Sequence, residues 1–210
     1  MTKTNKKISW VASFAIASYA IIAIASDIFA NKMLNLGGLA LAGGILLVPF
    51  SFTIRDLMHK LVGFQNAKRI VWATAFVNLA VAALMVVLDM LPAAVDGVDE
   101  SWHALMGTSW RIIIASFLAQ VLADLSDTYS FEWLTNKLKG KKIWLRVIVS
   151  NLISCPIDSI LFTLIAFLGV LPMPVMINSI ISSAIVKFII SLIAMPAAYA
   201  NEKVADKAGA

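Results

Sequence analysis

Apolar and polar residues are arranged in long blocks along this chain rather than in short alternating patterns. A helix that crosses a bilayer needs about 20 mostly apolar residues. Six stretches meet this requirement, with approximate bounds of 8–30, 37–54, 70–91, 108–130, 145–169 and 174–198. The connections are short, and the longest of them is 92–107. The pattern predicts an all-α membrane protein of six transmembrane helices that form a single domain, 1–210.

The composition supports a membrane protein over a soluble one. Hydrophobic residues make up 60% of the chain and charged residues 14%, with a mean hydropathy of +0.88. Soluble domains are about 45–50% apolar and about 25% charged. The one cysteine, Cys155, rules out a disulfide framework. The net charge of +5 does not indicate nucleic acid, because basic cytoplasmic loops of a membrane protein give the same sign.

The charges of the connections indicate an orientation in the membrane. Cytoplasmic loops carry an excess of Lys and Arg. With the N-terminus inside, the cytoplasmic segments are 1–7, 55–69, 131–146 and 199–210, and they hold 14 of the 17 basic residues. The outer connection 92–107 is acidic instead. We therefore expect both termini to be cytoplasmic.

One alternative concerns the first span. Lys6 and Lys7, followed by an apolar stretch and "AIAS" at 23–26, also fit a cleavable signal peptide. The apolar region of about 18 residues is longer than the core of a typical signal peptide. Cleavage would also place every later basic loop on the outer side of the membrane, against the charge rule. We favour a retained first helix.

The second predicted span opens with the glycine-rich stretch "LNLGGLALAGGILLVPF". Gly37, Gly38, Gly43 and Gly44 allow close approach of helices, as small residues do in lipid. They also fit a broken or re-entrant helix that lines a cavity. We favour the helix-packing interpretation.

Two charged residues lie near the middle of predicted spans, where charges are costly. Asp158 lies 14 residues before Pro172, in the turn between spans five and six, and Lys187 lies 15 residues after it. At about 1.5 Å per residue, both are roughly 21 Å from that turn. The two helices are antiparallel, so the spacing predicts an Asp158–Lys187 pair. The pair either locks the helices together or belongs to a functional site, and we favour function because intramembrane charges usually mark it.

Other polar residues lie at helical spacing near this depth. Asn151, Ser154 and Asp158 share one face of span five. Asp124 and Asp127 face alike near the end of span four. These two carboxylates suit a proton-linked step, because like charges disfavour joint ionisation, but they also fit a solvated position at the inner interface.

Polar residues also close the first two spans. Asp27 and Asn31 are one turn apart near the outer end of span one. Arg55 and Asp56 end span two at the inner surface, where solvent would satisfy both charges. We include Asp27, Asn31 and Asp56 among the candidate site residues.

Motifs of common enzyme classes are absent from the sequence. No GxxxxGK[ST], HExxH or GxSxG pattern occurs. His59 and His103 fall in connections on opposite sides of the predicted membrane, which disfavours a zinc protease. We expect neither catalysis nor a bound cofactor or metal.

Several stretches together resemble a known family. The similarity is to the VUT family of small membrane proteins, the queuosine precursor transporters, and it is carried by "SDIFANK", "VPFSFTIRDLMHKLVGFQNAKRIV", "DTYSFEWL", "NLISCPIDSILFTLIAF" and "SAIVKFIISLIAMPAAY". No single piece is specific, but their order and spacing are. The resemblance implies a six-helix fold related to the substrate-binding subunits of energy-coupling-factor vitamin transporters.

The same resemblance implies a substrate and a set of site residues. The substrate would be a 7-deazaguanine, such as 7-cyano-7-deazaguanine or 7-aminomethyl-7-deazaguanine. Carried over by position, the family pattern points to Asp56, Asp127, Asp158 and Lys187. Cys155 departs from the pattern, since many members carry Gln three residues before the Asp. Without the Gln amide, the hydrogen bonds available to the edge of a base are different.

A guanine-like ring fits the chemistry of these residues. Its adjacent N–H donors match a carboxylate, which accepts two parallel hydrogen bonds, so Asp158 suits that role. Aromatic side chains are candidates to stack on the ring, although in lipid they more often serve as packing. These candidates are Phe162, Phe167, Tyr129 and Trp133.

We therefore expect an importer in the inner membrane, with a midplane site between helices. Its partners would be a small nucleobase-like substrate, the lipid bilayer and a coupling ion, either proton or sodium. The alternative is a substrate-binding subunit of an ATP-driven vitamin or nucleobase uptake complex, which would depend on a separate ATPase. A membrane enzyme or scaffold is the weakest interpretation, because catalytic patterns are missing.

Overall fold

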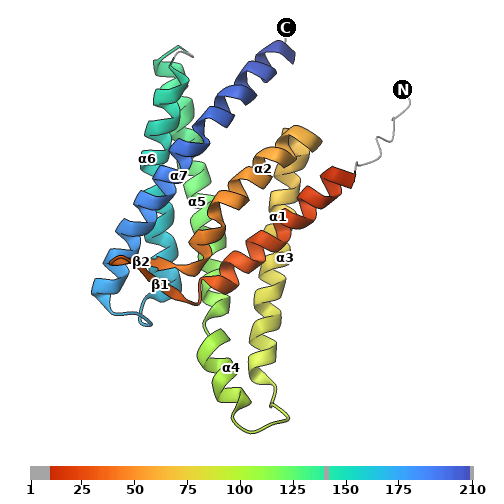
Figure 1. Cartoon of the computed structure of the whole chain (residues 1–210), viewed down its shortest axis with the longest axis vertical. Coiled ribbons are helices and arrows are strands. Elements are labelled where there is room, and N and C mark those ends of the chain that lie inside the picture. The colour runs from red at the N-terminus through yellow and green to blue at the C-terminus, as the bar shows by residue number, and fades with distance from the viewer. Residues whose placement is uncertain (1–9, 140–141, 209–210) are drawn as a thin grey trace.

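The computed structural model describes residues 10–139 and 142–208, without the side chains of 52, 56, 59, 60, 64, 143 and 194–208. It is a helical bundle with one small β-hairpin (Figure 1). In chain order, the elements are α1 (Trp10–Phe29), β1 (Met33–Leu36), β2 (Leu39–Ala42), the 3₁₀ helix η1 (Gly43–Leu47), α2 (Val48–Val62), α3 (Phe64–Met90), α4 (Val98–Met106), α5 (Ser109–Lys137), α6 (Ile143–Phe167) and α7 (Met173–Ala208).

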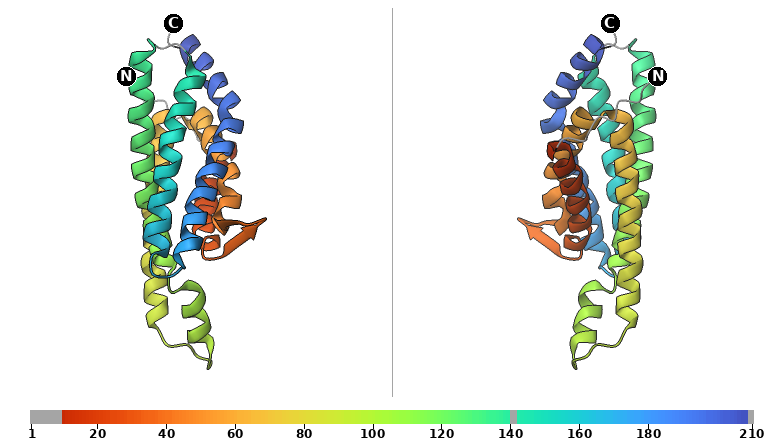
Figure 2. Two further views of the ribbon diagram at one scale, coloured as in Figure 1. Left: turned by 90° about the vertical axis from the view of Figure 1, so that its left-hand side faces the viewer. Right: turned by 90° about the vertical axis from the view of Figure 1, so that its right-hand side faces the viewer.

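The long helices divide into two groups by their direction. Helices α3, α5 and α6 run roughly along the long axis, whereas α1 and α2 cross it obliquely (Figure 1). Helix α5 packs along α6, and α6 packs along α7. The start of α1 and the end of α7 lie toward the same end of the molecule, while α4 extends at the opposite end (Figures 1 and 2). The hairpin projects from one side of the bundle (Figure 2).

Five helical segments are long and apolar enough to cross a membrane. They are Trp10–Phe29, Gln65–Met90, Val98–Lys137, Trp144–Phe167 and Met173–Ile193. Large apolar side chains cover their outer faces, among them Phe76, Leu84 and Ile193. An exposed apolar surface of this kind needs lipid around it. The chain is therefore a multi-pass, mainly helical membrane protein, and five of the six predicted spans are confirmed.

The prediction of a continuous second span over 37–54 is wrong. Strands β1 and β2 form an antiparallel hairpin in which Met33 pairs with Ala42 and Leu36 with Leu39. Gly37 and Gly38 make the turn with φ of +63° and +90°, which other residues rarely adopt. After the hairpin come the 3₁₀ helix η1 and the 15-residue helix α2. The glycine pair breaks the span because it favours a turn over a helix.

Helix α7 supplies hydrogen bonds to the hairpin through Asn178. The backbone N–H of Ala40 donates to Asn178 Oδ1 at 2.7 Å, and Asn178 Nδ2 donates to the carbonyl of Gly38 at 2.9 Å. Backbone polar groups need partners inside a bilayer, because no water is available there. One amide side chain thus satisfies two groups at the edge of the hairpin and attaches it to the bundle.

The second glycine pair, Gly43 and Gly44, packs against α1. A Cβ atom added to Gly43 would lie 2.5 Å from the carbonyl oxygen of Phe29, and one added to Gly44 would lie 2.3 Å from that of Ser26. The hydroxyl of Ser26 also donates to the Gly44 carbonyl at 3.1 Å. The two interpretations of the glycines therefore apply to different pairs. Gly37 and Gly38 break the span, and Gly43 and Gly44 allow close approach.

We expect Gly44→Ala to destabilise the protein, because the new methyl group would meet the rigid backbone of α1. Overpacking of this kind costs about 1–3 kcal/mol. The measurement is the thermal midpoint of the purified protein in detergent. Ala83→Val serves as the control, since it adds bulk at an exposed position of α3. A Gly44→Ala variant as stable as this control would contradict the close contact between η1 and α1.

Candidate functional site

A cavity of about 320 Å³ lies between the helices. Residues from α1, η1, α2, α3, α5, α6 and α7 line it. Eight of the ten predicted site residues are among them: Asp27, Asp124, Asp127, Asn151, Ser154, Cys155, Asp158 and Lys187. Residues from distant parts of the sequence thus converge on one space, which is typical of a small-molecule site.

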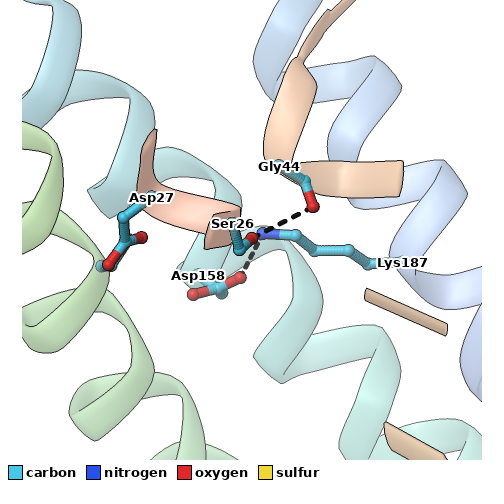
Figure 3. Close-up of polar contacts among 6 residues, drawn as sticks. Ser26, Asp27, Gly44, Asp158 and Lys187 are labelled. Atoms are coloured by element: carbon cyan, nitrogen blue, oxygen red, sulfur yellow. Dashed lines mark hydrogen bonds and ion pairs between the residues drawn. The ribbon is translucent and has the colours of Figure 1, made fainter. Parts of the chain in front are cut away.

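Asp158 of α6 and Lys187 of α7 form an ion pair in the wall of this cavity (Figure 3). The α6–α7 turn brings the two helices together antiparallel, so equal distances from the turn place the two side chains level with each other. Both side chains are largely buried, at 24% and 19% exposure. The ammonium group also lies 5.8 Å from the centre of the Phe162 ring, within the range of a cation–π contact. Phe162 lines the cavity as well.

The neighbouring turn of α6 adds three more polar residues to the wall. Ser154 donates to Asp127 Oδ1 of α5 across a long hydrogen bond of 3.4 Å. Asn151 donates through Nδ2 to the Val147 carbonyl of its own helix. Cys155 is partly buried and is a free thiol. The hydroxyl, amide and thiol therefore border the space beside Asp158.

At another part of the cavity, α2 contributes a basic residue. The sequence suggested a solvated Arg55 at the inner surface, but this residue is half-buried and lines the cavity. It interacts electrostatically with Asp124 of α5. Asp124 and Asp127 therefore line a cavity that is also lined by the positively charged side chain of Arg55. Arg55 was missed because α2 is shorter and more inclined than a regular span.

Asp27 of α1 is held in a separate polar cluster. Its Oδ2 accepts from Nδ2 of Asn78 on α3 and its Oδ1 accepts from the hydroxyl of Ser116 on α5, both at 2.5 Å. Asp27 is only 7% exposed. Sequence reasoning missed both partners, although an asparagine in the middle of the apolar run 70–91 was a usable signal. The cluster joins three helices at one buried carboxylate.

Two predicted site residues are not placed at the cavity. Asn31 caps the end of α1, where its Nδ2 donates to the Ile28 carbonyl at 3.0 Å, and its Oδ1 accepts from Ser109. It does not line the cavity. Asp56 belongs to α2, but its side chain lies outside the described residues.

The structure also separates the four aromatic candidates. Phe162 lines the cavity, and Phe167 is packed into a buried apolar cluster beside it. Tyr129 and Trp133 are 70% and 59% exposed and do not line the cavity. Among the described residues, no group of three or more His, Cys, Asp or Glu side chains has the arrangement of a metal site.

Comparison with known proteins gives three findings. A protein of Bacillus subtilis named "Probable queuosine precursor transporter" is 29% identical over 174 residues, which cover 82% of this chain and 76% of that protein. A protein of Haemophilus influenzae with the same name is 32% identical over 101 residues, covering 48% of this chain and 40% of the relative. No solved structure matches the chain.

A family profile supplies the remaining evidence. The profile described as "Putative vitamin uptake transporter" matches residues 42–201, which include η1 and all helices from α2 to α6 as well as most of α7. The matched region contains Asp158, Lys187 and most of the cavity lining. The chain therefore belongs to the family of vitamin uptake transporters that this profile defines.

Proposed function

We propose that the protein imports queuosine precursors, 7-cyano-7-deazaguanine or 7-aminomethyl-7-deazaguanine, across the inner membrane. The relatives' names supply the class of substrate. The observation that carries the proposal is the Asp158–Lys187 pair in the wall of a cavity inside a bundle of membrane helices. The substrate binds in this cavity, and alternating access releases it on the other side.

Asp158 recognises the base through hydrogen bonds. A guanine-like ring carries adjacent N–H donors, and an ionised carboxylate has about four lone-pair positions to accept them. Lys187 contacts Oδ2 of this carboxylate. Its positive charge offsets the cost of burying the carboxylate and leaves lone pairs for a ligand. Removing either charge would therefore change the recognition of the base.

The cavity also fits the ligand in size and in lining. Its volume of about 320 Å³ lies near the lower end of the roughly 300–1,000 Å³ typical of small-molecule sites. A flat bicyclic base is a ligand of that scale. Phe162 offers an aromatic face on the same wall as Asp158, and base stacking on such a face contributes about 1–3 kcal/mol.

We expect Asp158→Asn to weaken the binding of 7-cyano-7-deazaguanine by roughly 10- to 100-fold, because charge-assisted hydrogen bonds are worth about 1.5–3 kcal/mol. The measurement is isothermal titration of the purified protein in detergent. Asp96→Asn removes a charge from an exposed outer loop and serves as the matched control. Unchanged binding by Asp158→Asn would contradict the assigned role.

A double variant separates recognition from simple loss of the ion pair. Asp158→Asn alone leaves Lys187 as an unpaired buried charge, which is itself destabilising. In Asp158→Asn/Lys187→Met neither charge remains. If Asp158 binds the base, the double variant stays weak; if the pair is only structural, the double variant regains affinity.

Cys155 provides a test that needs no substitution. It is the one cysteine of the chain and borders the cavity beside Asp158. A bound base would cover its sulfur, so we expect 7-cyano-7-deazaguanine to slow labelling of Cys155 by a small maleimide. Mass spectrometry of the intact protein measures the rate. Adenine serves as the control ligand, and equal protection by both bases, or by neither, would contradict specific binding here.

The proposed orientation has both termini in the cytoplasm. In a Cys155→Ser background, we expect a membrane-impermeant thiol reagent to label Glu100→Cys in whole cells. Asn136→Cys, at the end of α5, should react only after the membrane is opened. Both positions are exposed. The reversed labelling pattern would show that the bundle is inserted the other way.

Uptake by the purified chain in liposomes distinguishes an autonomous importer from a binding subunit. We expect the chain alone to take up labelled 7-cyano-7-deazaguanine. Binding without uptake, together with co-purification of an ATPase, would instead identify a subunit of an ATP-driven complex.

A further inference from the structure

Asp27 is a buried acid whose hydrogen-bonding partners are neutral. Both of its oxygens accept hydrogen bonds, one from the amide of Asn78 and one from the hydroxyl of Ser116. Among the described residues, no basic side chain forms an ion pair with it. An ionised carboxylate in the interior of a membrane protein ordinarily has a cation partner, as Asp158 has in Lys187. Asp27 thus differs from Asp158, the acid of this cavity that pairs with a lysine.

Asp27 faces away from the ion pair, toward α3 and α5 (Figure 3). The cavity residues contributed by α3 are uncharged. The titratable and charged groups that share the cavity with Asp27 are Tyr19 of α1, Arg55 of α2, Asp124 and Asp127 of α5, Cys155 and Asp158 of α6, and Lys187 of α7.

Asn78 adds a second observation. It is 8% exposed, and its Oδ1 is buried without a hydrogen-bond partner among the described residues. A buried acceptor without a partner destabilises the folded protein, because it has lost its hydrogen bonds to water. Oδ1 belongs to the same side-chain amide as Nδ2, which donates to Asp27. One oxygen of the cluster, Asn78 Oδ1, therefore receives no hydrogen bond from the described residues.

One added proton would supply a donor for this oxygen. A protonated Asp27 would have an O–H to donate, and rotation of the Asn78 amide would present Oδ1 to receive it. The Ser116 hydroxyl would still donate to the other carboxyl oxygen. With the proton absent, Asn78 donates through Nδ2, as the structure shows. The same three side chains can thus bind either form of the acid.

We propose that Asp27, Asn78 and Ser116 form the proton-binding site that couples uptake to a proton gradient. This inference rests on the proposed import function and identifies its coupling ion. The proton adds to the carboxylate of Asp27 from one side of the membrane and leaves to the other, with no other bond made or broken. Asp27 also lines the substrate cavity, so water in that cavity gives the proton a route.

The geometry favours a proton over a sodium ion. A metal cation needs several oxygen ligands that point at one place, and hard cations of this type generally take about six. Here both carboxylate oxygens already receive hydrogen-bond donors, one of which is a nitrogen. Binding of a proton requires a change in only one of these hydrogen bonds. The carboxyl group of Asp27 becomes the donor and the Asn78 amide becomes the acceptor.

Helix α1 links the proton site to the substrate site. The residue before Asp27 is Ser26, whose hydroxyl donates to the Gly44 carbonyl of η1, and both residues line the cavity that contains the ion pair (Figure 3). Asp27 contacts α3 and α5 instead. Consecutive residues of one helix thus hold the two sides of the cavity. Protonation that changes the contacts of Asp27 would shift α1 and its contact with η1.

Asp27→Asn tests the coupling in liposomes. We expect wild type to acidify the liposome interior when 7-cyano-7-deazaguanine enters, as read by an internal pH-sensitive dye. The variant should show no base-dependent acidification at concentrations of the base that saturate its binding, as measured by titration in detergent. Asp96→Asn is the matched control. Acidification that persists in Asp27→Asn, or uptake by wild type that follows a sodium gradient instead, would overturn the proposal.

Infrared difference spectroscopy tests the proton site independently of transport. We expect the carbonyl band of a protonated carboxyl group to appear in wild type as the pH is lowered and to be missing in Asp27→Asn. In Asn78→Ala this band should shift, because the acceptor of the proton is lost. A spectrum that is the same in wild type and Asp27→Asn would overturn the proposal. If wild type does not bind the base, the proposed function fails, while this spectrum still decides whether Asp27 binds a proton.

Discussion

The ion pair between Asp158 and Lys187 is the interaction on which the rest of the site depends. A charged side chain near the centre of a span costs about 2.5–3.5 kcal/mol on insertion scales, so each partner needs the other. This need fixes the register of α6 against α7, because only one register brings the two side chains level. The same register sets Asn151, Ser154 and Cys155 at one wall of the cavity. The packing of α6 against α7 and the position of the polar residues in the cavity wall are thus determined together.

The irregular segment after α1 contributes to the lining of the cavity that contains this pair. A regular second span would pack along its neighbours, whereas the hairpin, η1 and the short α2 leave an oblique element over the cavity. Inside a bilayer, non-helical backbone is tolerated only where protein partners satisfy it or a cavity lies beside it. Here Asn178 supplies partners to the hairpin, and Gly44 contacts α1 while lining the cavity.

Buried acids in the two halves of the cavity are stabilised in different ways. Asp158 has a cation partner, which suits a residue that stays ionised and binds a ligand. Asp27 has neutral partners that can donate or accept, which suits a residue that changes its protonation state. Helix α1, which carries Asp27, packs against α2, η1, α3 and α5.

The sequence by itself determined the membrane class, five of the spans and the pairing of Asp158 with Lys187. These features follow from hydrophobic length and helical rise, which are local properties. Only the tertiary structure decided that the second predicted span is broken. Gly37 and Gly38 are by themselves compatible with a packed helix, and the hairpin is stabilised by Asn178, which only the fold brings near. It also decided the partners of Asp27. Asn78 and Ser116 lie 51 and 89 residues away along the chain, and no periodicity along the chain relates residues on three separate helices.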